Sequence, residues 1–523
     1  MVNRRFNPDL EIFSSRRRQR AGFRVRRARF FKNLLKIMLV PVAVVGLILG
    51  IRMMADLFQP ESNHLTVLGY EGELLTGAII TADNGHQTKS AEGGSAFIVF
   101  DTPTSLRVEA AGYNTAIYRV DNLPNEGPLQ LQMEPLVLSG RVRASNSNGV
   151  VGAIVTIGEH ETVTGAFGSF EVIAAAPGVV DITKPTWEDT SEEWDGSTGR
   201  LDIEMSPFVV KGLRIFGYDT TNPEYRELLR IADVTVINAF AFDTKNEFGE
   251  VMYLSEDYEA FPMEAIINKY DVHERLALAK EHGLYTITRI VTFQDEFAAK
   301  NFPDRAILNS ETDEPWRSWQ GIGWMDPTDP ESWDYPIRMG IEACQFGFDE
   351  VQFDYVRFPT DGDTSVAVYD DPQAAASGEG RVATIAAFLT EARTRINAEG
   401  CAVSADLFSI VLSVSNDQGI GQKVEELSAA VDVLSPMIYP SHYANGWLNF
   451  DVPNNHPGEV IGEALEASVG RLQGGAHMRP WLQAFSWSAE QVLEAIATAD
   501  EYGSGWLLWN SQSEFQQSWI PAN

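Results

Sequence analysis

The feature that most constrains the fold is a regular alternation of strand-like and helix-like segments, which begins near Val209 and continues to the end of this 523-residue chain. Short runs of β-branched and aromatic residues alternate with longer segments typical of helices. Asn222-Pro223 and Asp329-Pro330 each place a polar residue before a proline, which is typical of a helix start. The pattern predicts an α/β TIM barrel, a (β/α)8 fold, over residues 209–523.

We predict eight barrel strands. They lie at residues 211–217, 234–242, 285–293, within 347–359, and at 403–408, 433–439, 479–485 and 505–510. In the fourth, Val351, Phe353 and Tyr355 alternate with Glu350, Gln352 and Asp354, which is the period of a strand. In a parallel barrel the chemistry gathers at the C-terminal ends of the strands, where Asp354 would lie.

Polar and aromatic side chains stand at or just after the ends of the second to eighth predicted strands. Because these ends converge in a barrel, we expect the side chains to line one opening. Carboxylates and amides can bind sugar hydroxyls, and aromatic rings can stack on sugar rings, so the set is suited to carbohydrate. The residues are Asp243, Lys245, Arg289, Asp354, Arg357, Asp406, Tyr439, His442, Gln483, Trp509 and Asn510.

Glycoside cleavage needs two carboxyl groups, one to protonate the leaving oxygen and one to attack carbon or activate water. Asp354 and Asp406 lie on adjacent predicted strands with matching parity, and they are the natural pair. We predict Asp354 as nucleophile or base and Asp406 as acid, with Asp243 as the substitute for either. The other eight residues would bind substrate. The alternative for each single aspartate is a structural ion pair with a neighbouring arginine.

Four motifs resemble a bacterial family of glycoside-hydrolase-like barrels that was formerly a domain of unknown function. They are Gly347–Pro359, Leu434–Tyr443, Arg479–Gln483 and Gly505–Asn510. The resemblance covers about residues 209–515 and implies a TIM barrel and carbohydrate hydrolysis. The family's barrel is distantly similar to the α-amylase type, in which the fourth-strand aspartate is the nucleophile, and this implies that role for Asp354. The acid on the fifth strand of amylase-like barrels is usually glutamate, whereas Asp406 stands there in this sequence. The second-strand motif is altered, as Asp243-Thr-Lys-Asn-Glu-Phe-Gly249.

Two shorter segments before the barrel repeat each other. Gly77-Ala-Ile-Ile-Thr81 returns as Gly152-Ala-Ile-Val-Thr156, and Leu129–Pro135 returns as Leu201–Pro207. Short alternating runs broken by Gly, Pro and Asn predict two small β-sandwich domains, at residues 65–136 and 137–208. The order of motifs resembles the carboxypeptidase-regulatory-like, transthyretin-like sandwich, which implies a spacer or adhesion role. Exposed Trp187 and Trp194 could instead stack on sugars.

The N-terminus combines a basic segment with an apolar run. Residues 1–36 contain twelve Lys and Arg but two acidic residues, although the whole chain carries a net charge of -33. An uncharged run from Ile37 to Ile51 follows. We predict a basic cytoplasmic segment at 1–36 and a single transmembrane anchor at 37–55, with the rest outside the cell membrane. A nucleic-acid-binding arm is the alternative, which the adjoining apolar run disfavours.

These expectations combine into an extracytoplasmic glycoside hydrolase of the cell envelope with a carbohydrate substrate and no nucleic-acid partner. We expect no cofactor and no metal; Asp361-Gly-Asp363 is read as a turn rather than a calcium site. Cys344 and Cys401 are the only cysteines and could pair if they lie close. The alternatives are a non-catalytic carbohydrate-binding barrel and a purely structural envelope protein. The sequence predicts no oligomeric state.

Overall fold

The computed structural model describes residues 62–144, 148–197, 199–217, 221–257, 262–503 and 505–523. They fall into two compact units, the first ending at Glu134 and the second comprising Ala111–Tyr113 and Pro135–Asn523. The predicted basic segment and anchor, at 1–36 and 37–55, lie outside the described residues. Among the residues that are described, no helix has both the length and the apolar character needed to cross a membrane.

The first unit contains two small sheets. One has the strand order β4-β1-β7 and the other β3-β2-β5-β6. Leu65 and Val67 of β1, Ile80 of β2 and Val108 of β5 are fully buried. The strands are β1 (Asn63–Leu68), β2 (Ile79–Ala82), β3 (Gln87–Lys89), β4 (Ser95–Ile98), β5 (Thr104–Glu109), β6 (Ala116–Val120) and β7 (Leu129–Gln132).

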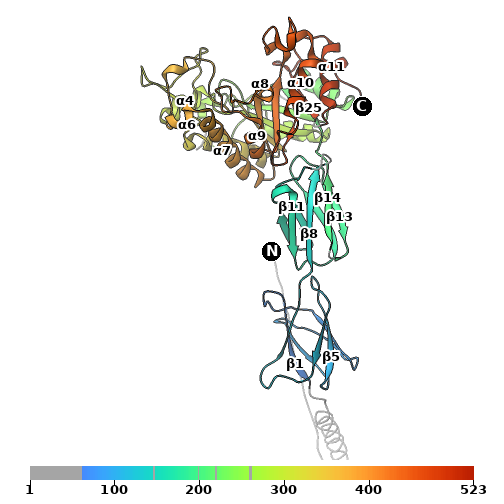
Figure 1. The fold of residues 1–523 in the computed structure, drawn as a ribbon. Helices are drawn as coiled ribbons and strands as arrows, with labels where there is room; N and C mark the ends of the chain where they lie inside the picture. Colours follow the sequence, from blue (N-terminus) through green and yellow to red (C-terminus); the bar gives the residue numbers. More distant parts are fainter. Residues whose placement is uncertain (1–61, 145–147, 198, 218–220, 258–261, 504) are drawn as a thin grey trace, which may run out of the picture. The chain divides into compact units, whose positions relative to one another are not determined.

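The second unit begins with two sheets in the same order, β11-β8-β14 and β10-β9-β12-β13 (Figure 1). One apolar cluster contains side chains from both sheets, among them Val142 of β8 and Ile182 of β12. Trp187 and Trp194 belong to this cluster and are 7% and 4% exposed, so they are not the exposed platforms that the sequence suggested. The strands are β8 (Val137–Ala144), β9 (Ile154–Ile157), β10 (His160–Val163), β11 (Ser169–Ile173), β12 (Gly178–Thr183), β13 (Thr190–Trp194) and β14 (Arg200–Met205).

The rest of the second unit is an eight-stranded parallel barrel, which confirms the predicted C-terminal architecture. All neighbouring pairs are parallel, and β15 pairs with β25 to close the sheet. A short ninth strand, β23 (His477–Met478), also pairs with β22. In their order around the barrel, the strands are β15 (Val210–Ile215), β16 (Ala239–Lys245), β17 (Tyr285–Val291), β19 (Glu350–Asp354), β21 (Ala402–Phe408), β22 (Val433–Ile438), β24 (Trp481–Gln483) and β25 (Gly505–Trp509).

Two predicted strands differ from the observed ones. The second was expected from Val234 but begins at Ala239, because Val234 caps the preceding helix and Thr235 Oγ1 donates back to the Ile231 carbonyl. The seventh was expected as one segment but is divided into β23 and β24 around Pro480, whose nitrogen carries no hydrogen to donate to a ladder.

Helices follow most barrel strands (Figure 1). The Asn222 side chain caps the first at Glu224 N, 2.8 Å away, and Ser488 and Gln491 form a capping box on the last. The first of these starts is the one that Asn222-Pro223 predicts. The helices are α2 (Pro223–Asp233), α3 (Val272–Glu281), α4 (Glu296–Asn301), α5 (Asp334–Phe346), α6 (Pro372–Ala376), α7 (Gly378–Asn397), α8 (Ile410–Ser413), α9 (Val424–Ala430), α10 (Pro457–Ser468) and α11 (Ala489–Asp500). A two-stranded sheet, β18 (Leu308–Asn309) with β20 (Ala367–Val368), lies in the connecting loops.

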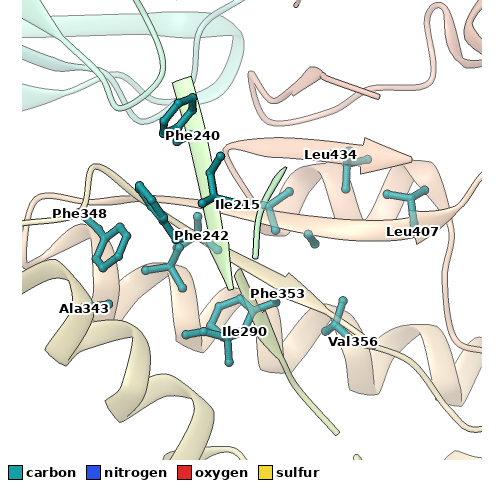
Figure 2. Close-up of a cluster of buried hydrophobic side chains, with 14 of the residues drawn as sticks. Ile215, Phe240, Phe242, Ile290, Ala343, Phe348, Phe353, Val356, Leu407 and Leu434 are labelled. Carbon is teal, nitrogen blue, oxygen red and sulfur yellow. The ribbon is translucent and has the colours of Figure 1, made fainter. Parts of the chain in front are cut away.

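The main core contains apolar side chains from alternate barrel positions and from the helices. Figure 2 shows part of it, including Phe242 of β16 near Phe348, and Phe353 of β19 beside Ile290 of β17. Cys344 of α5 and Cys401, just before β21, form a disulfide. The intervening positions of the strands carry the polar groups, so the same alternation that builds the core turns Gln352 and Asp354 toward the barrel interior.

The barrel interior is itself tied together by polar contacts. Glu350 of β19 forms a two-point ion pair with Arg479, and its Oε1 accepts a hydrogen bond from Ser404 of β21. Gln352, two residues further along β19, donates to Ser435 Oγ at 3.1 Å. These buried contacts leave the next inward positions, Asp354 and Asp406, at the open end of the strands.

Candidate active site

A cavity of about 620 Å³ opens at the C-terminal ends of the barrel strands. It contains the charged side chains of Glu247, Arg289, Asp354, Arg357 and Asp406. Aromatic and apolar side chains supply most of the remaining wall. The other lining residues are Tyr355, Phe408, Ser409, Ile410, Met437, Tyr439, His442, Tyr443, Ala444, Trp447 and Trp509.

Arg289 is the centre of the charged network. Its Nε and Nη2 both donate to Asp354 Oδ2, at 3.0 and 2.5 Å. Nη1 donates to Asp243 Oδ1 at 3.1 Å, and Nη2 also reaches Glu247 Oε1 at 2.7 Å. The pKa of Arg289 is raised well above its usual value, because Asp354, Glu247 and Asp243 together outweigh the opposing effect of burial. One guanidinium therefore fixes three carboxylates.

Asp354 is held in place by the backbone as well. It is the last residue of β19, and the next residue, Tyr355, has a φ of 50° in the left-handed region. This turn lets the Tyr355 N–H donate to Asp354 Oδ1 at 2.7 Å. Strained backbone of this kind is maintained where the surrounding structure fixes it, and functional sites are a common place for it. Both carboxylate oxygens of Asp354 thus have defined partners.

Asp406 has the opposite environment. It is 1% exposed; Oδ1 accepts a hydrogen bond from Trp481 Nε1 at 2.8 Å, whereas Oδ2 is buried without a hydrogen-bond partner. Burial raises the pKa of Asp406 well above its usual value, and the neighbouring Asp354 raises it further. The environment of Asp406 therefore favours its protonated form, as a general acid requires.

Glu247 is a site residue that the sequence interpretation missed. It follows β16, and its carboxylate contacts Arg289 at the cavity wall. Although burial opposes ionisation, Arg289 and Arg214 lower the pKa of Glu247. The available signal was its place in the second-strand motif, Asp243–Gly249, two residues beyond Lys245.

Aromatic side chains surround the carboxylates. Arg214 and Arg289 lie 4.3 and 4.7 Å from the centre of the Trp509 ring. Burial and the two aspartates raise the pKa of Tyr439 well above its usual value, and burial lowers that of His442. Both side chains are therefore neutral near pH 7 and can offer hydrogen bonds without net charge.

The structure brings together most, but not all, of the predicted site residues. Asp354, Asp406, Arg289, Arg357, Tyr439, His442 and Trp509 line the cavity. Asp243 is fully buried and is paired with Arg214 and Arg289 instead of lining it. Lys245, Gln483 and Asn510 also do not line it.

These last three side chains are engaged elsewhere. The Lys245 ammonium lies 2.6 Å from Asp295 Oδ2. The Gln483 amide accepts a hydrogen bond from Ser441 N and donates one to Asn454 Oδ1. The Asn510 side chain donates to the Ala484 carbonyl and accepts from Gln512 N. Within the described ranges, no group of three or more His, Cys, Asp or Glu side chains is placed to hold a metal ion.

The site geometry agrees with a comparison with known families. Residues 212–515, more than half of the chain, match the family described as "Putative glycosyl hydrolase domain". The chain belongs to this family. Since this member has a parallel barrel with a carboxylate-lined cavity at the C-terminal strand ends, the family description and the site point to the same class of chemistry.

Three solved structures are similar to parts of the chain. A hypothetical protein from Ruminiclostridium thermocellum is 30% identical, with 37% of this chain and 96% of that chain covered and a TM-score of 0.33. The PgaB glycoside hydrolase domain from Bordetella bronchiseptica is 15% identical, with 58% and 95% covered and a TM-score of 0.43. The PelA glycoside hydrolase domain from Pseudomonas aeruginosa is 12% identical, with 58% and 96% covered and a TM-score of 0.35. No curated protein matches the chain.

Proposed function

We propose that the protein hydrolyses glycosidic bonds in the cavity at the end of the barrel, with Asp354 as nucleophile or base and Asp406 as general acid. The observation that carries the proposal is the contrast between the two carboxyls. Both oxygens of Asp354 are held by hydrogen bonds, one from the Arg289 guanidinium and the other from a backbone N–H. Asp406 is buried beside it with a raised pKa and one oxygen without a partner.

In this mechanism the free Oδ2 of Asp406 gives its proton to the leaving glycosidic oxygen. Asp354 acts on the anomeric carbon, directly or through a water molecule. Glu247 shares Arg289 with Asp354 and has a lowered pKa, so it is unsuited to the acid role and is a second negative group beside a developing oxocarbenium ion. Asp243 stays below the cavity and orients both arginines.

We further propose an extracytoplasmic setting, with an anchor at residues 37–55 and the two N-terminal sheet pairs as carboxypeptidase-regulatory-like spacers. The basic segment followed by an apolar run supports the anchor and its orientation. The Cys344–Cys401 disulfide supports an oxidising compartment, where such bonds persist. Protease accessibility of the barrel in intact cells tests this placement.

The catalytic proposal is tested with the full chain on a panel of polysaccharides and on aryl glycosides. Asp354→Asn should abolish turnover of both kinds of substrate. Asp406→Asn should reduce polysaccharide turnover about 10²- to 10⁴-fold, as expected for loss of a general acid. It should affect aryl glycosides with good leaving groups much less, because they need little protonation. The measurement is kcat for each substrate and variant.

The matched control is Asp451→Asn, the same change at an exposed aspartate outside the cavity. It should leave turnover unchanged. Full activity of Asp354→Asn would exclude Asp354 as the nucleophile or base. Glycan binding without turnover by the wild type would favour a non-catalytic carbohydrate-binding barrel instead.

A further inference from the structure

Arg357 has a charged side chain in the cavity, and the proposed catalytic mechanism gives it no role. It is 6% exposed and lines the cavity next to both catalytic aspartates. Its guanidinium lies between two rings, 4.1 Å from the centre of Tyr355 and 4.4 Å from that of Phe408. In the described part of the chain, the ion pairs around the cavity involve Arg214 and Arg289 but not Arg357.

The polar neighbours of Arg357 do not compensate its charge. Its Nε is buried without a hydrogen-bond partner. Both oxygens of Asp354 are engaged by Arg289 and by Tyr355 N, and burial raises the pKa of Asp406. Burial lowers the pKa of Arg357, with only partial compensation from Asp354, Tyr355 and Asp406. A guanidinium nevertheless stays charged in proteins.

Burying a cation in this way is unfavourable unless something supplies a counter-charge. The contacts with Tyr355 and Phe408 offset part of this desolvation penalty, because a cation is attracted to the face of an aromatic ring. The two rings also fix the plane of the guanidinium. A fixed planar fork with free donors matches a carboxylate or sulfate group, and a carboxylate can be bound at two points.

We propose that the substrate is an acidic glycan, and that Arg357 binds the anionic group of the sugar that occupies this cavity. This inference rests on the proposed function for the hydrolytic step, although the binding itself does not depend on turnover. The carboxylate of a uronic acid fits the fork best, and a sulfate ester is the other source of the same charge. A positively charged amino sugar fits poorly, because Arg289 already engages both Glu247 and Asp354.

The test measures binding with the full chain carrying Asp406→Asn, so that hydrolysis is slow compared with the binding measurement. The probes are oligosaccharides of glucuronic, galacturonic and mannuronic acids, the same oligosaccharides with each carboxylate reduced to an alcohol, and sulfated neutral oligosaccharides. We expect an acidic probe to bind at least about 10-fold more tightly than its reduced form. Arg357→Gln should weaken the binding of the acidic probe by about 10- to 100-fold, whereas Arg357→Lys should weaken it less.

Two further measurements separate ligand binding from a structural role. Arg305→Gln, at a half-buried arginine outside the cavity, should leave the affinity unchanged. Arg357→Met should leave the melting temperature unchanged or raise it, because it removes an uncompensated buried charge while filling the space between the rings. A marked loss of melting temperature would show that Arg357 serves the fold.

The remaining outcomes are equally decisive. Equal binding of the acidic and reduced probes, or no binding of any acidic probe at millimolar concentration, overturns the inference. Preference for the sulfated probes keeps the anionic substrate class and identifies sulfate as its source. Cleavage of neutral glycans alone overturns the inference but leaves the hydrolase proposal intact. Tight, Arg357-dependent binding of acidic glycans without cleavage by the wild type would support the inference and overturn the hydrolase proposal.

Discussion

At the scale of single residues, the proposed mechanism depends on the protonated form of Asp406. Burial raises the pKa of Asp406, and the neighbouring Asp354 raises it further. Because Asp406 must carry a proton to act as the acid, activity should fall as pH rises through its raised pKa. We expect a bell-shaped profile for the wild type, measured as kcat/KM against pH. On aryl glycosides, Asp406→Asn should lose the alkaline decline; an unchanged decline would assign it to another group.

The same carboxyl should make stability depend on pH. The pKa of Asp406 is higher in the folded chain than the value of about 3.9 in an unfolded one, so its stabilising contribution is complete below about pH 3.9 and is lost as pH rises through the folded pKa. Each unit of upward shift costs about 1.4 kcal/mol at higher pH. Asp406→Asn should therefore unfold at a higher urea concentration than the wild type, with a difference that grows as pH rises from about 3.9 to the folded pKa. Parallel pH dependence in both proteins would contradict this.

At the scale of elements, the sequence is sufficient to predict the barrel and to place the cavity residues that lie on regular strands. Arg289, Asp354 and Asp406 were found because strand parity is regular in β17, β19 and β21. Lys245 was misplaced because the register of β16 against β17 shifts between Asp243 and Lys245. A single such irregularity turns the following side chain to the other face of the sheet. Periodicity alone does not reveal it.

Loops set the second limit on prediction from sequence. Glu247 reaches Arg289 only because Asn246–Glu250 forms a tight turn, in which Asn246 Oδ1 accepts hydrogen bonds from Phe248 N and Glu250 N. Gln483 has the composition of a binding residue, yet its amide is used to hold neighbouring loops. Whether an amide faces substrate or a loop depends on tertiary contacts that the strand pattern does not encode.

The turn itself gives a prediction at this scale. Gly249 has a φ of +85°, and a Cβ there would overlap the Asp295 carboxylate, which caps Ala298 N and pairs with Lys245. Gly249→Ala should destabilise the protein by roughly 2–4 kcal/mol, combining backbone strain with overpacking. It should also lower kcat by displacing Glu247. Gly283→Ala, with a φ of +68° and nothing within 4 Å, isolates the strain and should cost about 1–2 kcal/mol. Equal losses in both variants, measured by urea unfolding, would exclude the clash.

At the scale of the whole molecule, the barrel and the sheet pair that precedes it belong to one compact unit. A buried ion pair joins them. Lys184, just after β12, lies 3.3 Å from Asp432, which precedes β22, and both side chains are almost completely buried. Asp432 also pairs with Arg393 at 2.9 Å and accepts a hydrogen bond from Val403 N. The sheet pair is therefore expected to unfold together with the barrel.

Lys184→Met tests this expectation. Removing one partner of a buried pair leaves the other charge undercompensated, which costs about 3–5 kcal/mol where no other partner exists. Because Arg393 stays beside Asp432, we expect the lower end of that range, with a reduced melting temperature for the barrel itself. Arg200→Met, which breaks an exposed pair on the same sheet pair, should change stability by less than about 1 kcal/mol. Calorimetry of the full chain should show the barrel transition moving in the first variant only. If the barrel transition stays in place while a separate, smaller transition moves, the two parts unfold independently and the ion pair does not couple them.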